Sequence, residues 1–254
     1  MSSLRNALRA TCGALIVSVV LAAPLRAEEI LAAVAANFTD AATEIGTAFR
    51  KATGNTVTYS FGASGQLYTQ ITQDAPFHVF LSADQTRAEK AEADGFAVPG
   101  SRFTYAVGKL VLWSADPARI DGTGAALKDA SLTHVAIADP ATAPYGAAAV
   151  EVMRHLGVFE ALEPKIVQGK SISQTHQFAA TANADVGFVA LSQIVADDKG
   201  SRWIVPQELY TPIRQDAVLL KKGEASEAAR AYVEFLKSPE ATAIIGKYGY
   251  AVGE

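Results

Sequence analysis

Cysteine is almost absent from the 254-residue chain, which contains only Cys12. This residue precedes an apolar run at residues 13–23, which follows the basic residues Arg5 and Arg9. A basic segment followed by an apolar run of this length is typical of a secretory signal peptide. The predicted signal peptide, residues 1–27, contains the only cysteine, so disulfides and thiol chemistry are excluded from the mature chain. A secreted chain of this size without cysteine indicates a bacterial periplasm.

The chain also has no excess of positive charge and no basic stripe. Its 22 Lys and Arg against 26 Asp and Glu give a formal charge of −4, and removal of the three arginines in residues 1–27 lowers this to −7. Such a charge argues against a nucleic-acid partner, which would need clusters of Lys and Arg. Phosphate-binding glycine motifs are absent. The four histidines are scattered without i,i+4 spacing, so we expect no metal centre built from side chains.

What the sequence does contain is an alternation of strand and helix patterns. The apolar run 29–36 is typical of a strand buried on both faces. A helix pattern follows it, with apolar residues at helical spacing until Gly54. Further strands are expected at 55–59 and 77–81, each followed by a helix. This order predicts an α/β fold with a mostly parallel sheet flanked by helices.

Two long apolar runs, 105–114 and 212–220, divide the rest of the chain, and strand and helix patterns alternate again between them. Because two separate series of strands and helices each need a covered sheet, we expect two lobes joined by these runs as crossing strands. The first predicted lobe comprises residues 28–107 and 217–254, and the second comprises residues 108–216. A single continuous sheet is the alternative.

The stretch Ser60–Leu67 is the main candidate for a binding element. It joins the second predicted strand to its helix, which begins near Ser64. Free N–H groups at a helix start attract an anion, although a serine there can also act only as an N-cap. Asn37 follows the first strand in the same way. Ligands of such sheets bind at the carboxyl ends of the strands, so we expect Asn37 and Ser64 at one edge.

Pro144 and Tyr145 begin a helix in the second half and add backbone donors and a phenol. No Arg, Lys or carboxylate accompanies these candidates. Neutral donors suit a compact, fully ionised oxyanion, and the lack of an acceptor disfavours one that carries a proton. Gly62–Gln66 also resembles the nucleophile elbow of hydrolases, without the glycine expected two residues after the serine. A secreted serine hydrolase is therefore an alternative, and it needs a histidine within hydrogen-bond reach of Ser64.

Motifs along the whole mature chain resemble those of periplasmic molybdate-binding proteins. They are Ala35–Asp40, Ser60–Leu67, Ala75–Asp84, Ala138–Pro140, Pro144–Gly146, Val186–Val189 and Lys247–Tyr250. The resemblance implies the two-lobed type II periplasmic-binding-protein fold, each lobe a mostly parallel sheet flanked by helices. It also implies ligand contacts from Asn37, Ser64, Tyr145 and the backbone near Ile172. These residues would contact the oxygen atoms of the anion and not its metal atom.

The resemblance further implies a function and its partners. Members of this family bind molybdate or tungstate and deliver it to the permease of an inner-membrane ABC importer, without catalysis or a cofactor. We therefore expect a periplasmic monomer that binds no nucleic acid. A binding protein for sulfate or a small organic acid is the alternative within this class. His78 stands where the family usually has aspartate, and Asn37 where many members have serine.

Overall fold

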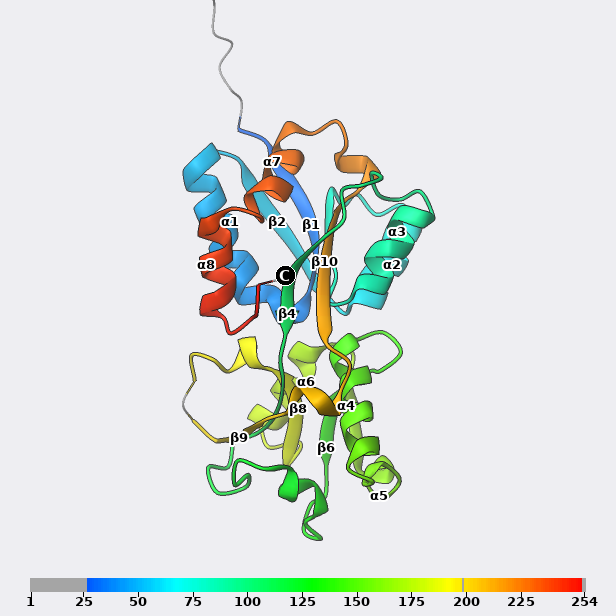
Figure 1. The fold of residues 1–254 in the computed structure, drawn as a ribbon, viewed down its shortest axis with the longest axis vertical. Helices are drawn as coiled ribbons and strands as arrows, with labels where there is room; N and C mark the ends of the chain where they lie inside the picture. Colours follow the sequence, from blue (N-terminus) through cyan, green and yellow to red (C-terminus); the bar gives the residue numbers. More distant parts are fainter. Residues whose placement is uncertain (1–26, 198, 253–254) are drawn as a thin grey trace, which may run out of the picture.

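The computed structural model describes residues 27–197 and 199–252, which form two α/β lobes stacked along the long axis of the molecule (Figure 1). Residues 1–26 of the predicted signal peptide lie outside the described residues. No helix in the described part is long and apolar enough to cross a membrane. Each lobe has its own five-stranded sheet, so the prediction of two lobes is confirmed and the single continuous sheet is wrong.

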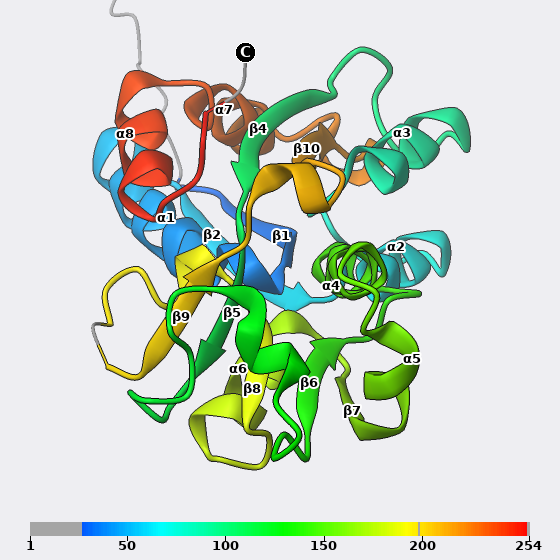
Figure 2. The same ribbon diagram turned by 60° about the horizontal axis from the view of Figure 1, so that its bottom comes forward.

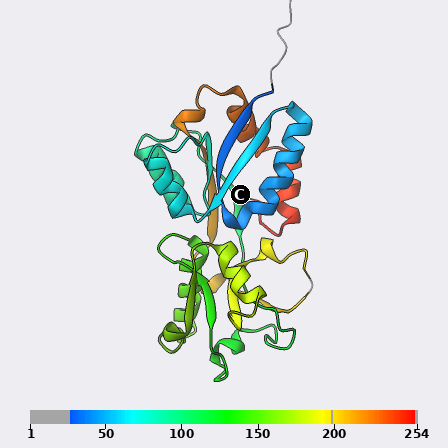
Figure 3. The same cartoon turned by 180° about the vertical axis from the view of Figure 1, so that it is seen from behind.

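The first lobe is a mixed sheet covered by helices on both faces (Figures 1 and 3). Its strands are β1 (Glu29–Ala35), β2 (Thr56–Gly62), β3 (Val79–Leu81), β4 (Phe103–Gly108) and β10 (Ile213–Leu219), in the spatial order β2-β1-β3-β10-β4. Strand β1 is parallel to β2 and β3, whereas β10 is antiparallel to β3 and β4.

The core of this lobe lies between the sheet and a layer of helices on each of its two faces. One face is covered by α1 (Thr39–Thr53), α7 (Glu227–Phe235) and α8 (Pro239–Lys247), and the other by α2 (Ser64–Thr72) and α3 (Gln85–Ala93). Along β1, Ile30 and Val34 pack with the first group, whereas Ala33 packs with the second. The strand is therefore buried on both faces, as its apolar sequence predicts.

The second lobe repeats this architecture (Figure 2). Its strands are β5 (Leu110–Ser114), β6 (Val135–Ala138), β7 (Ile166–Gly169), β8 (Val186–Ala190) and β9 (Ser201–Ile204), in the order β7-β6-β8-β5-β9. Its helices are α4 (Pro144–His155), α5 (Phe159–Leu162) and α6 (Ile172–Ala180). Strand β6 is parallel to β7 and β8, and β5 is antiparallel to β8 and β9.

Short 3₁₀ helices connect several of these elements. They are η1 (Ala36–Phe38), η2 (Gly124–Lys128), η3 (Glu163–Lys165), η4 (Leu191–Gln193), η5 (Gln207–Leu209) and η6 (Lys221–Gly223). Two of the long helices end or begin at the expected local signals. Gly54 terminates α1 with φ at 80°, and Ser238 caps α8 ahead of Pro239 at its first position.

The two crossings differ in detail from the sequence-based division. The run 105–114 is broken at Lys109, so β4 ends in the first sheet and β5 begins in the second. The return crossing comes earlier than predicted, because β10 already pairs with β4 at Ile213, opposite Gly108. Residues 213–216 therefore belong to the first sheet and not to the second lobe. An apolar run marks a buried strand but does not show which sheet it joins.

Candidate functional site

A small cavity lies between the two lobes. Its lining residues are Ala35, Ala36, Asn37, Gly62, Ala63, Ser64, Ala83, Ala143, Pro144, Tyr145 and Ile172. The volume open to the centre of a water-sized sphere is about 10 Å³, which is the space of about one water molecule. All four residues singled out in the sequence line this one cavity, although they are spread over more than half of the chain.

Each of the four lies at the start of a helix. Ser64 and Ile172 are the first residues of α2 and α6, and Tyr145 is the second residue of α4. Asn37 lies in η1, which leads directly into α1. The first N–H groups of a helix have no partner within it, and the helix dipole is positive at this end. Four positive helix ends, two from each lobe, therefore meet at the cavity.

Ser64 is buried, and its hydroxyl oxygen accepts a hydrogen bond from the Ala83 N–H at 2.8 Å. The residue at the N-cap position of α2 is Ala63, and Ser64 itself makes no capping hydrogen bond. The interpretation of Ser64 as a simple cap is therefore wrong. Because the oxygen accepts from Ala83, the hydroxyl proton is left to donate elsewhere.

The Asn37 side chain is hydrogen-bonded to Gln215 of β10. Strands β4 and β10 lead from the first lobe to the second, and the region where they do so is called the hinge below. Asn37 Nδ2 donates to Gln215 Oε1 at 2.8 Å and to the Tyr250 hydroxyl at 2.9 Å. Its backbone carbonyl accepts from Ser192 Oγ and from the Tyr250 hydroxyl. Both amide protons are thus used, so the donor that Asn37 can offer to the cavity is its backbone N–H. The sequence interpretation of a side-chain donor is corrected accordingly.

The Tyr145 phenol is also directed to the hinge. Its oxygen accepts from Gln215 Nε2 at 3.3 Å and lies so close to Gly108 that a Cβ there would be 2.0 Å away. Burial raises the pKa of the phenol well above its usual value, so it is neutral. The expected phenolic donor is therefore packed among hinge residues. At the cavity, Tyr145 can also supply the backbone N–H at the start of α4.

Ile172 contributes through its backbone alone. Ser171 is the N-cap of α6 and accepts from the Gln174 N–H, which leaves the N–H of Ile172 without a partner inside the helix. The Ile172 carbonyl accepts from Gln193 Nε2 at 3.2 Å. This bond ties the start of α6 to η4.

A buried polar network behind the cavity was missed in the sequence. At its centre, Gln215 accepts from Asn37 and from the Tyr105 hydroxyl and donates to Tyr145, and it is fully buried. The Tyr250 hydroxyl links Asn37 to Ser192 of the second lobe at 2.9 Å. Gln215 lies in the polar segment Arg214–Asp216 of strand β10, and polar residues within a strand between two lobes are the sequence signal that could have indicated it.

The site offers hydrogen-bond donors but no charged side chain. None of the lining residues carries a charge, and no cluster of three metal-ligating side chains occurs in the described residues. Compact oxyanions that are fully ionised match such a cradle, because their charge is spread over several N–H and O–H donors. The lining has no carboxylate that could accept a hydrogen bond from a proton on the anion.

The alternative of a serine hydrolase requires a histidine within hydrogen-bond reach of Ser64. Within the described residues, no histidine hydrogen-bonds the Ser64 hydroxyl, whose partner is a backbone N–H. His78, whose role the sequence left open, accepts from the Leu31 N–H at 2.9 Å in the first sheet and does not line the cavity. The condition for the hydrolase alternative is therefore not met in this part of the chain.

Comparisons with known proteins place the chain among binding proteins. The family described as bacterial extracellular solute-binding protein matches residues 30–251. The chain is 64% identical over 250 residues to the molybdate-binding protein ModA of Rhodobacter capsulatus, covering 98% of this chain and 99% of that protein. It is 55% identical over 235 residues to the protein of the same name in Azotobacter vinelandii, with coverage of 91% and 93%.

A solved structure extends these comparisons to three dimensions. The periplasmic molybdate-binding protein of Azotobacter vinelandii superposes with a TM-score of 0.86 at 42% identity, covering 89% of this chain and all of that one. The two-lobed arrangement is therefore shared with a protein of known fold.

Proposed function

The chain belongs to the family of bacterial extracellular solute-binding proteins, and we propose that it captures molybdate between its two lobes and delivers it to an ABC importer. The protein acts in the periplasm, the compartment that the name of the Azotobacter vinelandii structure gives for that protein. Its partners are the oxyanion and the permease of the transporter. Tungstate, which has the same charge and shape as molybdate, is a second ligand of the same site.

The observation that carries this proposal is the uncharged cavity at which four helix starts meet. The Ser64 hydroxyl and the backbone N–H groups of Asn37, Ser64, Tyr145 and Ile172 are its donors to the anion. They bind the oxygen atoms and form no bond to the metal atom. Donors fixed by helix ends need little reorganisation on binding, which favours the ligand they fit.

Lobe closure follows from the division of the donors between the lobes. Asn37 and Ser64 come from the first lobe, and Tyr145 and Ile172 from the second, so an anion held by all four favours the closed arrangement. The lobes part to admit the anion and close around it, which brings the donors of both lobes to its oxygen atoms. The protein works as a monomer and catalyses no reaction.

Selectivity rests on charge state and size. Monohydrogen phosphate has a proton that needs an acceptor, and the cavity has no carboxylate to provide one. Sulfate is fully ionised but smaller than molybdate, so it cannot reach the donors of both lobes equally well. Charge state thus excludes phosphate, and the spacing of the helix starts disfavours sulfate.

Titration calorimetry of the mature chain with molybdate, tungstate, sulfate and phosphate tests the proposal. We expect tight one-to-one binding of molybdate and tungstate, much weaker binding of sulfate and none of phosphate. Sulfate binding as tight as molybdate binding would identify a different oxyanion carrier. Failure to bind any of the four would overturn the proposal.

A further inference from the structure

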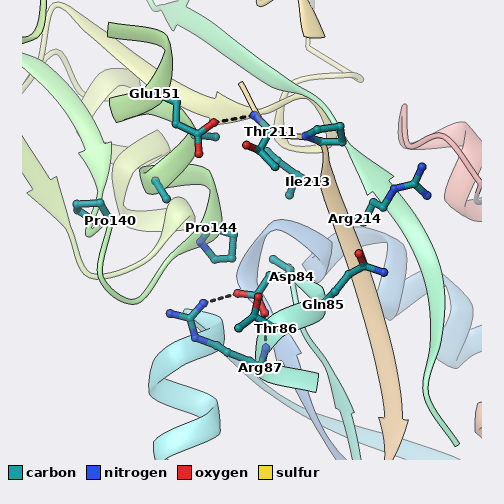
Figure 4. Close-up of a pocket in the computed structure, with 14 residues that line it drawn as sticks. Asp84, Gln85, Thr86, Arg87, Pro140, Pro144, Glu151, Thr211, Ile213 and Arg214 are labelled. Carbon is teal, nitrogen blue, oxygen red and sulfur yellow. Dashed lines mark hydrogen bonds and ion pairs between the residues drawn. The ribbon is translucent and has the colours of Figure 1, made fainter. Parts of the chain in front are cut away.

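Beside the oxyanion cavity lies a larger cleft of about 320 Å³ between the lobes (Figure 4). Ala83 and Pro144 line both spaces, so the cleft is the neighbouring part of the same lobe boundary. Arg87 of α3 projects into it. The guanidinium does not line the oxyanion cavity, and the side chain is 23% exposed.

Arg87 connects the two lobes. Its Nη2 donates to the backbone carbonyl of Ala141 in the second lobe at 2.8 Å. Its Nη1 forms an ion pair with Asp84, which also accepts from the Arg87 backbone N–H at 2.9 Å as the N-cap of α3. The guanidinium is therefore held in position by its own lobe and presents its remaining edge to the other lobe. Asp84 also balances its charge, so the oxyanion cradle stays neutral.

The adjacent carbonyl of the same loop is bound as well. Thr142 O accepts from the Gly65 N–H at 2.9 Å, next to Ser64 at the start of α2. A Cβ at Gly65 would lie 3.0 Å from Arg87 Nε and 3.0 Å from Thr142 Cα, so these three groups are in close contact. The first lobe thus holds two successive carbonyls of the loop 139–143.

That loop is held together by its own hydrogen bonds and leads directly into a wall of the oxyanion cavity. Asp139 accepts from the N–H of Ala141 at 3.0 Å and from the Thr142 hydroxyl at 3.0 Å, which fixes the turn internally. The next residues are Ala143, Pro144 and Tyr145, which line the cavity. A bond from the first lobe to Ala141 therefore holds the start of α4 against the ligand.

We propose that Arg87 is an inter-lobe latch: a positioning residue that binds the Ala141 carbonyl in the closed state and slows release of the oxyanion without touching it. This inference rests on the proposed function. A hydrogen bond from a charged donor is stronger than one between neutral groups. Because this bond joins the lobes only when they are closed, it should affect dissociation and leave association nearly unchanged.

The test compares Arg87→Met with Lys90→Met in the mature chain. Both substitutions remove one positive charge from α3, but Lys90 pairs with Asp94 within the first lobe. Release of radiolabelled molybdate into excess unlabelled molybdate gives the dissociation rate. We expect Arg87→Met to raise this rate about tenfold, with the association rate changed less than about twofold, and Lys90→Met to match the unsubstituted chain.

Other outcomes separate the latch from the function on which it rests. If the unsubstituted chain binds molybdate and Arg87→Met releases it at the same rate, the latch is wrong, and a fall in the melting temperature of the ligand-free form alone would assign Arg87 a local role in α3. If the unsubstituted chain binds no oxyanion, the proposed function fails. Lobe separation by X-ray scattering then decides the latch: Arg87→Met should be more open than Lys90→Met, and equal radii of gyration would overturn it.

Discussion

At the scale of single residues, Ser64 shows how a small hydroxyl is prepared for an anion. Its oxygen accepts from the Ala83 N–H, and its place at the first position of α2 puts the helix dipole behind it. The fixed acceptor role leaves one donor direction for the hydroxyl proton. The side chain is buried, so its rotamer is set before the ligand arrives.

Replacing Ser64 by alanine should weaken molybdate binding about 10- to 100-fold, because one hydrogen bond to a charged ligand is lost. The Ala83 N–H also loses its partner, so the free energy of unfolding of the ligand-free form should fall by about 1–3 kcal/mol. Calorimetry measures the affinity, and urea unfolding measures the stability.

Thr72→Ala is the matched control for this substitution. Thr72 lies on the exposed side of the same helix, and its hydroxyl donates to the Thr69 carbonyl. This variant should leave the affinity unchanged. If Ser64→Ala loses stability and keeps its affinity for molybdate, Ser64 serves the fold alone and the donor role assigned to it is wrong.

At the scale of elements, the crossing strands β4 and β10 carry polar groups inside the hinge. The pairing shifts between Gln215 and Asp216, so that they oppose Ala106 and Thr104. Asp216 is fully buried and accepts from the Thr104 hydroxyl at 2.7 Å and from Arg102 Nη1 at 2.6 Å. Such an irregularity re-aims neighbouring side chains. Here it lets Gln215 face the Asn37–Tyr145 network.

Gly108, at the end of β4, is the residue that this packing requires to be small. Gly108→Ala would place a Cβ 2.0 Å from the Tyr145 hydroxyl and 2.7 Å from Gln215 Nε2. The displaced phenol should move the start of α4, so we expect molybdate affinity to fall several-fold and the free energy of unfolding to drop by about 1–3 kcal/mol. Calorimetry and urea unfolding measure the two effects.

Gly246→Ala provides the comparison for the hinge variant. A Cβ at Gly246 in α8 would have no neighbour within 4 Å, so this change should be neutral or stabilising by up to about 1 kcal/mol. Equal behaviour of the two alanine variants would show that the hinge accommodates a methyl group. The close contact at Gly108 would then contribute neither to molybdate affinity nor to stability.

The sequence predicts individual strands and helices better than it predicts the contacts at the hinge. Strand β1 and helix α8 follow from local signals, namely an apolar run and the Ser238–Pro239 start. The sequence also predicts that Asn37 and Ser64 lie at the same edge of the sheet, because each lies at a helix start directly after a strand. The hinge could not be read in this way, because Gln215 meets its partners through strand register and not through spacing in the chain. For the same reason the contact between Gln215 and the Tyr145 phenol could not be predicted.

At the scale of the whole molecule, the two lobes have separate sheets and meet through a few named hydrogen bonds. Gly65 and Arg87 bind the loop 139–143 on one side, and Ser192 binds the Asn37 carbonyl on the other. The cavity lies among these contacts. That four helix starts face one point depends on how the lobes are stacked, which no local pattern in the sequence encodes.

A ligand held by both lobes should stabilise and compact the molecule together. At a molybdate concentration 100 times the dissociation constant, binding contributes about 2.7 kcal/mol, which corresponds to a rise in melting temperature of about 5–10 °C for a chain of this length. The radius of gyration from X-ray scattering should fall over the same titration, because the anion favours the closed state. Ser64→Ala at the same molybdate concentration should show a smaller rise. A higher melting temperature without compaction would mean that the oxyanion binds one lobe only, because donors on a single lobe can stabilise the native state without drawing the second lobe towards it.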